Sequence, residues 1–133
     1  MATIFSKIIA REIPAQFVFE DEVCVVIMDK FPAIRGQLLV IPKIEVDYIF
    51  DLPEDVYLHL FKIAKKVAVA ADKAFETFRT CIIVEGFEVP HVHVKVYPMM
   101  AKEHLGVAIS QKPNEASDVE LLQQAGQIRA KLQ

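Results

Sequence analysis

The sequence predicts an α+β fold in which one long helix lies across an antiparallel sheet of about five strands, with a short N-terminal helix and a separate C-terminal helix. Three observations lead to this fold class. Short runs rich in β-branched residues alternate with turn signals, one long stretch repeats its apolar residues at steps of three and four, and a shorter stretch near the C-terminus does the same.

Length and charge limit the kind of protein that this chain forms. With 133 residues, 53% of them hydrophobic, we expect a single domain over residues 1–133 with a core of its own. A net charge of −3 gives no bulk attraction to nucleic acid or to anionic lipid, so we expect neither as a partner. The chain lacks a signal-peptide pattern and an apolar run near the ~18 residues that span a bilayer. We therefore expect a soluble, cytoplasmic protein.

The first part of the chain predicts a short helix followed by three strands. The segment IFSKIIARE is amphipathic and ends before Pro14, because the residue that precedes a proline is disfavoured in a helix. Two β-rich runs then flank the acidic residues 20–22 in FVFEDEVCVVIMD, and RGQLLVIP begins at a glycine turn and ends at Pro42. Together these runs predict an antiparallel meander.

A long helix is predicted from Asp51 onwards. Asp51 stands three residues ahead of Glu54, as in a capping box, and Pro53 is tolerated in the first turn because its missing N–H would have no helical partner. The strand CIIVEG follows the helix. The apolar stripe of the helix consists of Val56, Leu60, Ile63, Val67, Ala71, Ala74 and Phe78.

The C-terminal part of the chain predicts a loop and then a last helix. Residues 99–116 show weak periodicity and are expected to form a loop, whereas Ser117 and Glu120 resemble a capping pair. The helix that follows carries an apolar stripe formed by Leu121, Ala125, Ile128 and Leu132. This stripe has to be buried, either on its own domain or on a second subunit.

The two cysteines, Cys24 and Cys81, lie inside apolar runs. Cysteines in such places more often behave as small buried hydrophobes than as a disulfide or a metal-binding pair. We assign them no catalytic role.

The stretch VPHVHVKVYP carries the residues with reactive side chains. Side chains alternate along a β-strand, so His91, His93 and Lys95 are expected on a face toward water or a ligand, with the valines facing the core. Spacing alone leaves three interpretations open. The face is simply half solvated, or the two histidines bind a metal together with His59 or His104, or one histidine is a nucleophile or general base.

The same stretch resembles the signature of the histidine triad (HIT) family of nucleotide hydrolases and transferases, H-x-H-x-H followed by a proline. Two of the three histidines and the proline match. Four more blocks match the family in order: IFSKIIAREIPA, VFEDEVCVVIMD, RGQLLVIPK and DLPEDVYLHLFKIAKKVA. The resemblance covers residues 3–98 and does not extend over residues 99–133. It implies a HIT-like fold and a homodimer whose two sheets meet side by side.

The resemblance implies an enzyme that acts at the α-phosphate of purine nucleoside phosphoramidates or dinucleoside polyphosphates. The middle histidine, here His93, would form a covalent nucleotidyl intermediate, and the carbonyl of His91 would accept a hydrogen bond from its other ring nitrogen. Asp29 matches the acidic residue that binds the ribose hydroxyls, and an ordinary turn aspartate is equally consistent with its place. Three residues that match the walls of the base pocket, and that could equally be core residues, are Ile4, Phe5 and Ile27.

Several positions depart from the family pattern. Thr3 and Ser6 stand where many members carry C-x-x-C, so the sulfur ligands of a zinc site are missing and we expect no bound zinc and no other cofactor. Glu45 stands where a histidine often follows P-K. Gln37 replaces a histidine that usually follows the glycine. Val84 replaces an asparagine in VEGFEVP, a shortened version of the loop that helps to hold the phosphate.

Lys95 stands in place of the third histidine. In the family this position touches the phosphate and the leaving group, and related transferases and phosphorylases carry a glutamine there. A lysine keeps a hydrogen-bond donor and adds a positive charge. The resemblance therefore favours a catalytic residue at Lys95 in an enzyme of reduced activity. The alternatives are a catalytically weakened nucleotide-binding or protein-interaction module, and a purely structural dimer.

Overall fold

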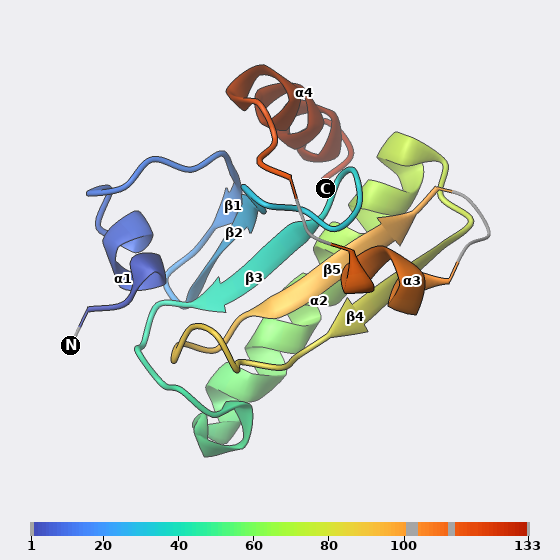
Figure 1. Cartoon of the computed structure of the whole chain (residues 1–133). Helices are drawn as coiled ribbons and strands as arrows, with labels where there is room; N and C mark the ends of the chain where they lie inside the picture. Colours follow the sequence, from blue (N-terminus) through green and yellow to red (C-terminus); the bar gives the residue numbers. More distant parts are fainter. Residues whose placement is uncertain (1, 101–103, 112–113, 133) are drawn as a thin grey trace.

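A five-stranded antiparallel sheet forms the centre of the molecule (Figure 1). The computed structural model describes residues 2–100, 104–111 and 114–132. The strands lie in the order β1-β2-β3-β5-β4, and the predicted α+β fold is confirmed. The strands are β1 (Phe17–Glu20), β2 (Cys24–Met28), β3 (Leu38–Pro42), β4 (Arg79–Ile83) and β5 (Val94–Met99). The helices are α1 (Ile4–Ile9), α2 (Glu54–Phe75), α3 (Leu105–Ser110) and α4 (Asp118–Arg129), and a 3-10 turn spans Ile49–Asp51.

Strands β1, β2 and β3 form the predicted meander, and alternation along them divides the core between the two faces of the sheet. One face packs against α2 and α4, and the other packs against α1. Residues of β2 and β3 on the α2 side are Cys24, Val26, Met28, Leu38 and Val40. Those on the α1 side are Val25, Ile27, Leu39 and Ile41.

Helix α2 crosses one face of the sheet as expected, but its ends differ from the prediction. Asp51 lies in the 3-10 turn, and the helix begins after Pro53 without any side-chain cap, so the expected capping box at Asp51 is wrong. Glu76 ends the helix in the left-handed conformation with a φ of 51°, which turns the chain away. Phe78 therefore lies beyond the helix and is 62% exposed instead of continuing the apolar stripe.

The segment predicted to be a loop contains a short helix, α3, over Leu105–Ser110. Its six residues are too few for a periodic pattern to be recognised, and none of them is buried. Parts of the predicted loop, residues 101–103 and 112–113, lie outside the described residues.

Helix α4 packs on its own domain, against α2 and strands β1 and β2. Ser117 caps it as predicted, since its hydroxyl accepts a hydrogen bond from the N–H of Glu120. Leu121, Ala125 and Ile128 are buried in the same core as the α2 stripe. The apolar stripe of the C-terminal helix is therefore buried on its own domain. Among the described residues, no helix is long and apolar enough to cross a membrane.

Candidate active site

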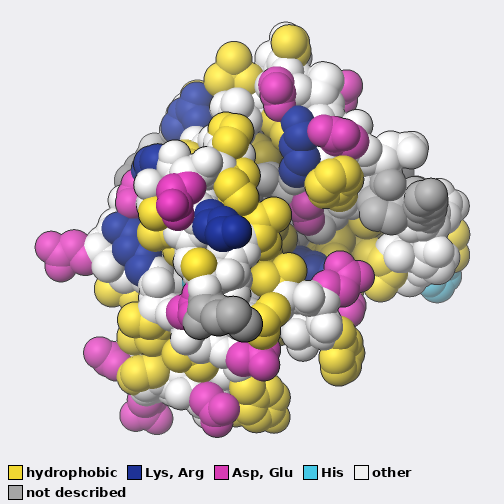
Figure 2. All heavy atoms as spheres, turned by 60° about the vertical axis from the view of Figure 1, so that its left-hand side comes forward, with side chains coloured by type: hydrophobic (Ala, Val, Ile, Leu, Met, Phe, Trp, Pro, Cys, Tyr) yellow, Lys and Arg dark blue, Asp and Glu magenta, His cyan; other side chains and the backbone are white. Residues whose placement is uncertain are grey.

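A cavity of about 780 Å³ opens on the α1 side of the sheet, within the range of roughly 300–1,000 Å³ that is usual for small-molecule sites. Figure 2 shows this side of the molecule, where hydrophobic side chains gather with acidic and basic ones around them. Apolar residues that line the cavity include Ile4, Phe5, Ile8, Ile27, Leu39 and Val89. Polar residues that line it include Asp29, Gln37, Glu85, Glu88, His93 and Lys95.

His93 lies at the base of the cavity, immediately before β5. Its Nδ1 is 2.8 Å from the carbonyl oxygen of His91. Because a carbonyl oxygen can only accept, Nδ1 must carry the ring proton, and in the neutral ring Nε2 then has a free lone pair. The side chain is only 6% exposed. The arrangement fixes the tautomer that a nucleophilic imidazole needs.

The charge state of His93 is set mainly by its surroundings. Burial lowers its pKa, and the positive charge of Lys95 lowers it further. The hydrogen bond to the His91 carbonyl and the carboxylate of Asp29 oppose this effect in part. The net result is a pKa below the ordinary value of 6.5, so the ring is neutral at neutral pH.

His91 does not face water or a ligand, and that expectation is wrong. The residue is fully buried and is absent from the cavity lining. The regular strand begins only at Val94, so the chain at His91 lies under α1, where the Phe5 ring meets the imidazole edge-on at a centroid distance of 5.8 Å. Its Nε2 bonds the Pro42 carbonyl oxygen and its Nδ1 bonds Thr3 Oγ1, each at 2.8 Å.

Thr3, Ser6 and Glu45 come together around the buried His91. The Ser6 hydroxyl donates to the Glu45 carboxylate, and the backbone N–H of Thr3 donates to the same carboxylate at 3.2 Å. The backbone N–H of Ser6 donates to Thr3 Oγ1 at 3.1 Å. Sequence reasoning noted these residues only as departures from a metal-binding pattern. All three replace a cysteine or histidine of the family pattern with a hydroxyl or a carboxylate. This was the one feature of the sequence that could have indicated a polar cluster.

Asp29 is held by Gln37, a contact that sequence reasoning missed. Asp29 Oδ2 accepts a hydrogen bond from Gln37 Nε2 at 2.8 Å, and Oδ1 accepts from the backbone N–H of Phe31 at 2.9 Å. Gln37 is 3% exposed, and its Oε1 accepts from the N–H of Ala33 at 2.6 Å. Asp29 is thus a turn aspartate and a cavity residue at once. Burial raises its pKa, although the Phe31 hydrogen bond and the charges of Lys95 and His93 act against this.

Lys95 lies on β5, between Leu39 on β3 and Ile83 on β4. It is half-buried and contributes to the cavity together with His93 and Asp29. Ile4, Phe5 and Ile27 also line the cavity. The structure therefore brings every predicted catalytic or nucleotide-binding residue except His91 to one cavity, while their roles stay predictions.

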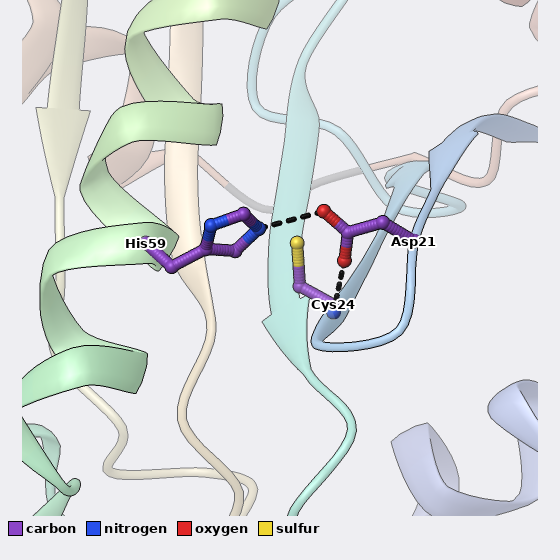
Figure 3. Close-up of side chains that lie close together, drawn as sticks. All are labelled: Asp21, Cys24 and His59. Atoms are coloured by element: carbon purple, nitrogen blue, oxygen red, sulfur yellow. Dashed lines mark hydrogen bonds and ion pairs between the residues drawn. The ribbon is translucent and has the colours of Figure 1, made fainter.

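A second group of donor side chains lies on the α2 side of the sheet (Figure 3). Asp21, Cys24 and His59 have ligand atoms within 4.8 Å of one another, the kind of set that could hold a metal ion. Asp21 Oδ2 and His59 Nε2 already bond each other at 2.6 Å. Burial, reinforced by Asp21, raises the pKa of the Cys24 thiol to about 12, so the thiolate that metals prefer is scarce at neutral pH. His59 thus pairs with Asp21 and not with His91 or His93.

Comparison with known proteins defines the class to which this fold and cavity belong. A family model described as HIT domain matches residues 10–102, more than half of the chain. An uncharacterized HIT-like protein of Methanocaldococcus jannaschii is 36% identical over 99 residues, which cover 71% of this chain and 77% of that protein. The protein named hit of Bacillus subtilis is 31% identical over 104 residues, 74% of this chain and 72% of that protein. The chain belongs to the HIT family.

Solved structures agree with this assignment. A HIT-like protein of Bartonella henselae involved in cell-cycle regulation superposes with a TM-score of 0.87 at 29% identity, covering 98% of this chain and 96% of that one. A hypothetical histidine triad nucleotide-binding protein of Sulfolobus tokodaii gives 0.83 at 28% identity, covering 96% and 89%. A zinc-bound histidine triad family protein of Mycobacterium smegmatis, 23% identical with a TM-score of 0.83 over 98% and 93% of the two chains, shares the fold.

Proposed function

We propose that the protein is a nucleotide hydrolase or nucleotidyl transferase that acts at the α-phosphate of purine nucleoside phosphoramidates or dinucleoside polyphosphates. His93 Nε2 attacks the phosphorus, a P–N bond forms to the ring, and the bond to the leaving group breaks with its electron pair. The leaving group then takes a proton. Water or another acceptor next attacks the same phosphorus, breaks the bond to the ring and regenerates His93.

The hydrogen bond of 2.8 Å between His93 Nδ1 and the His91 carbonyl supports this proposal most directly. It leaves Nε2 as the nitrogen able to attack, and the lowered pKa of His93 keeps that nitrogen unprotonated at neutral pH. The cavity around it has the size and the mixed lining of a small-molecule site. Membership of the HIT family supports a nucleotide as the ligand.

Asp29 would bind the ribose hydroxyls in this proposal, with Ile4, Phe5 and Ile27 against the base. A carboxylate can accept two hydrogen bonds side by side, which suits a pair of hydroxyls. Gln37 and the backbone N–H of Phe31 already hold the two oxygens in place. Ligand hydroxyls would use the remaining lone pairs of a preoriented group.

Lys95 would contact the phosphate and act beside the leaving group in place of the third histidine. Its positive charge attracts the phosphate and stabilises charge that develops there. An ammonium gives up its proton reluctantly near neutral pH, so departure of a basic leaving group such as an amine should be slow. We therefore propose low activity that favours phosphates over amines as leaving groups.

The same substitution favours a second candidate, a nucleotide-binding or protein-interaction module that has lost catalysis. Glu85 and Glu88 also line the cavity and would repel a negatively charged leaving group. Such a module would bind a mononucleotide at equilibrium without converting it.

A homodimer with the two sheets side by side is part of the proposal. Strand β4 lies at the edge of the sheet, and Ile82 on it is 43% exposed. An edge strand with apolar side chains is a natural pairing surface. Sedimentation should give the mass of two chains.

The experiment compares hydrolysis of an adenosine phosphoramidate by wild-type protein, His93→Ala and His104→Ala. His104 is an exposed histidine at the start of α3 and serves as the matched control. We expect His93→Ala to lose at least about 10³-fold in kcat and His104→Ala to keep wild-type turnover. Turnover by His93→Ala at the wild-type rate would contradict the proposal. Wild-type protein that binds AMP without any turnover would favour the binding module.

A further inference from the structure

A series of hydrogen bonds connects Glu45 with His93 through Ser6, Thr3 and His91. Glu45 accepts from the Ser6 hydroxyl, and the backbone N–H of Ser6 donates to Thr3 Oγ1 at 3.1 Å. Thr3 Oγ1 contacts His91 Nδ1 at 2.8 Å, and the His91 carbonyl accepts from His93 Nδ1 at 2.8 Å. Thr3 and His91 are far apart in the sequence, so α1 must be docked for this series to exist. The series ends at the ring that the proposed reaction uses.

The direction of each hydrogen bond in the series can be assigned from the partners. The Pro42 carbonyl can only accept, so His91 Nε2 carries a proton, and in a neutral ring Nδ1 must then be an acceptor. The proton between Thr3 Oγ1 and His91 Nδ1 therefore belongs to Thr3. Thr3 Oγ1 also lies 3.0 Å from Ser6 Oγ, whose own proton goes to Glu45. We assign the Thr3 proton to the shorter contact of 2.8 Å, because His91 Nδ1 needs a donor.

Glu45 provides the negative end of the series. The Ser6 hydroxyl lowers its pKa most strongly, and the N–H of Thr3 lowers it as well, although desolvation acts the other way. The carboxylate is ionised at neutral pH and accepts these bonds. It thereby orients Ser6 and the backbone of Thr3, the residue whose hydroxyl contacts His91.

We propose that Thr3 is a positioning residue for His93, because its hydroxyl donates to His91 Nδ1 and so fixes the ring and the carbonyl that holds the nucleophile. This inference rests on the proposed function of His93. Thr3 does not touch the reacting atoms and acts through His91. Misplacing a reacting group by about 1 Å can cost ~10²-fold in rate, so a modest shift of the His91 carbonyl would be measurable.

Thr3 also caps α1, and this role has to be separated from the positioning role. Its hydroxyl accepts from the N–H of Ser6, and α1 places Phe5 against both imidazoles, with a centroid distance of 4.8 Å to His93. Loss of the hydroxyl therefore weakens the cap as well as the bond to His91. A matched control is Ser117, which caps α4 through the same kind of bond without contacting His91.

The experiment compares Thr3→Val, Thr3→Ser and Ser117→Ala with the wild-type chain. Thr3→Val keeps the shape of the side chain and removes its hydroxyl, whereas Thr3→Ser keeps the hydroxyl. We expect kcat for an adenosine phosphoramidate to fall about 10-fold in Thr3→Val with KM within about twofold, and to return to within about threefold of wild type in Thr3→Ser. Ser117→Ala should lower the melting temperature and leave kcat unchanged.

Nitrogen-15 NMR of the imidazoles gives a readout that does not depend on turnover. In the wild-type protein we expect the proton of His91 on Nε2 and that of His93 on Nδ1. Thr3→Val should mix the two tautomers of His91 and weaken the His93 Nδ1–H signal, and Thr3→Ser should restore both. Unchanged ring signals in Thr3→Val, or failure of Thr3→Ser to restore them, would overturn the inference. If the wild-type protein has no turnover, the proposed function fails and these ring signals still decide the role of Thr3.

Discussion

Asp21 and Asp29 stand before and after β2 and have similar local hydrogen bonding, except that Asp21 also accepts from the backbone N–H of Cys24. Each accepts a bond from the backbone N–H two residues further on, at 2.8 Å and 2.9 Å. The second oxygen of Asp21 bonds His59 at 2.6 Å, and that of Asp29 bonds Gln37 at 2.8 Å. Their pKa values nevertheless move in opposite directions.

The difference comes from the partner and from burial. At Asp21 burial raises the pKa, but the hydrogen bonds from His59 and from two backbone N–H groups outweigh it and lower the pKa to about 2. At Asp29 burial dominates, and the partner Gln37 is a neutral amide. Similar turns thus produce a contact with His59 that stabilises the α2 side and, in the cavity, a carboxylate that burial destabilises. Stability and proposed function lie on opposite faces of the sheet.

The largest effect on stability should follow a change in the core of the α2 side. Ile128 is fully buried there, and Ile128→Ala should lower the free energy of unfolding by about 2–4 kcal/mol because it leaves a cavity. Leu122 lies on the same helix and is 54% exposed, so Leu122→Ala should change the free energy of unfolding by less than about 0.5 kcal/mol. Denaturant unfolding measures both. Equal losses would show that α4 is not packed as described.

Changes at Asp29, which lines the cavity, should affect ligand binding more than stability. Asp29→Asn should weaken AMP binding by about 1.5–3 kcal/mol, since bonds to a charged acceptor are lost. Because the folded pKa of Asp29 is raised, its favourable contribution to stability exists below the unfolded pKa and is lost as the pH rises through the folded pKa. At neutral pH the substitution removes the cost of burying an ionised carboxylate, and it also removes the hydrogen bond to Gln37. We expect a net stability change within about 1 kcal/mol by calorimetry.

Asp21→Asn should lower stability and leave AMP binding unchanged. The pKa of Asp21 falls from 3.8 to about 2 on folding, and at ~1.4 kcal/mol per pKa unit, reduced for partial exposure, this corresponds to roughly 1–2 kcal/mol. This contribution is present above about pH 4 and is lost as the pH falls through about 2. The stability difference between wild type and variant, measured from pH 7 to pH 2, should shrink accordingly. A constant difference would exclude ionisation of Asp21 as its cause.

Lys95→His should produce the smallest effect, and one that depends on the substrate. A histidine is a better proton donor near neutral pH, so kcat/KM should rise about fivefold for a phosphoramidate, which has a basic leaving group. It should change less for a dinucleoside polyphosphate. The two substrates are compared across pH 5 to 9, where a histidine donor titrates. Equal changes for both would refute the role proposed for Lys95.

Sequence patterns predicted those elements whose residues face one core. The valines around His93 and the stripe of α2 belong to the main core, as their spacing indicated. The ends of α2 were not predictable in the same way, because Asp51 and Glu54 satisfy a capping pattern that a 3-10 turn displaces. Local rules favoured one start of the helix, and tertiary packing selected another.

The site was predictable only in part, because its support comes from distant contacts. The spacing of His93 and Lys95, read with the family resemblance, predicted that they share a face, and both line the cavity. The contacts of Thr3 with His91 and of Gln37 with Asp29 depend on how α1 and the turn before β3 dock. No periodicity encodes such contacts. For the same reason the burial of His91 under α1 was missed.

Trapping of the covalent intermediate tests the proposed chemistry most directly. The wild-type chain is mixed with an adenosine phosphoramidate, quenched with base to preserve a P–N bond, and digested for peptide mass spectrometry. We expect one adenylyl group on the peptide that contains His93, present in Lys95→His and absent in His93→Ala. An adenylyl group on another residue, or turnover without any adduct on His93, would contradict His93 as the nucleophile.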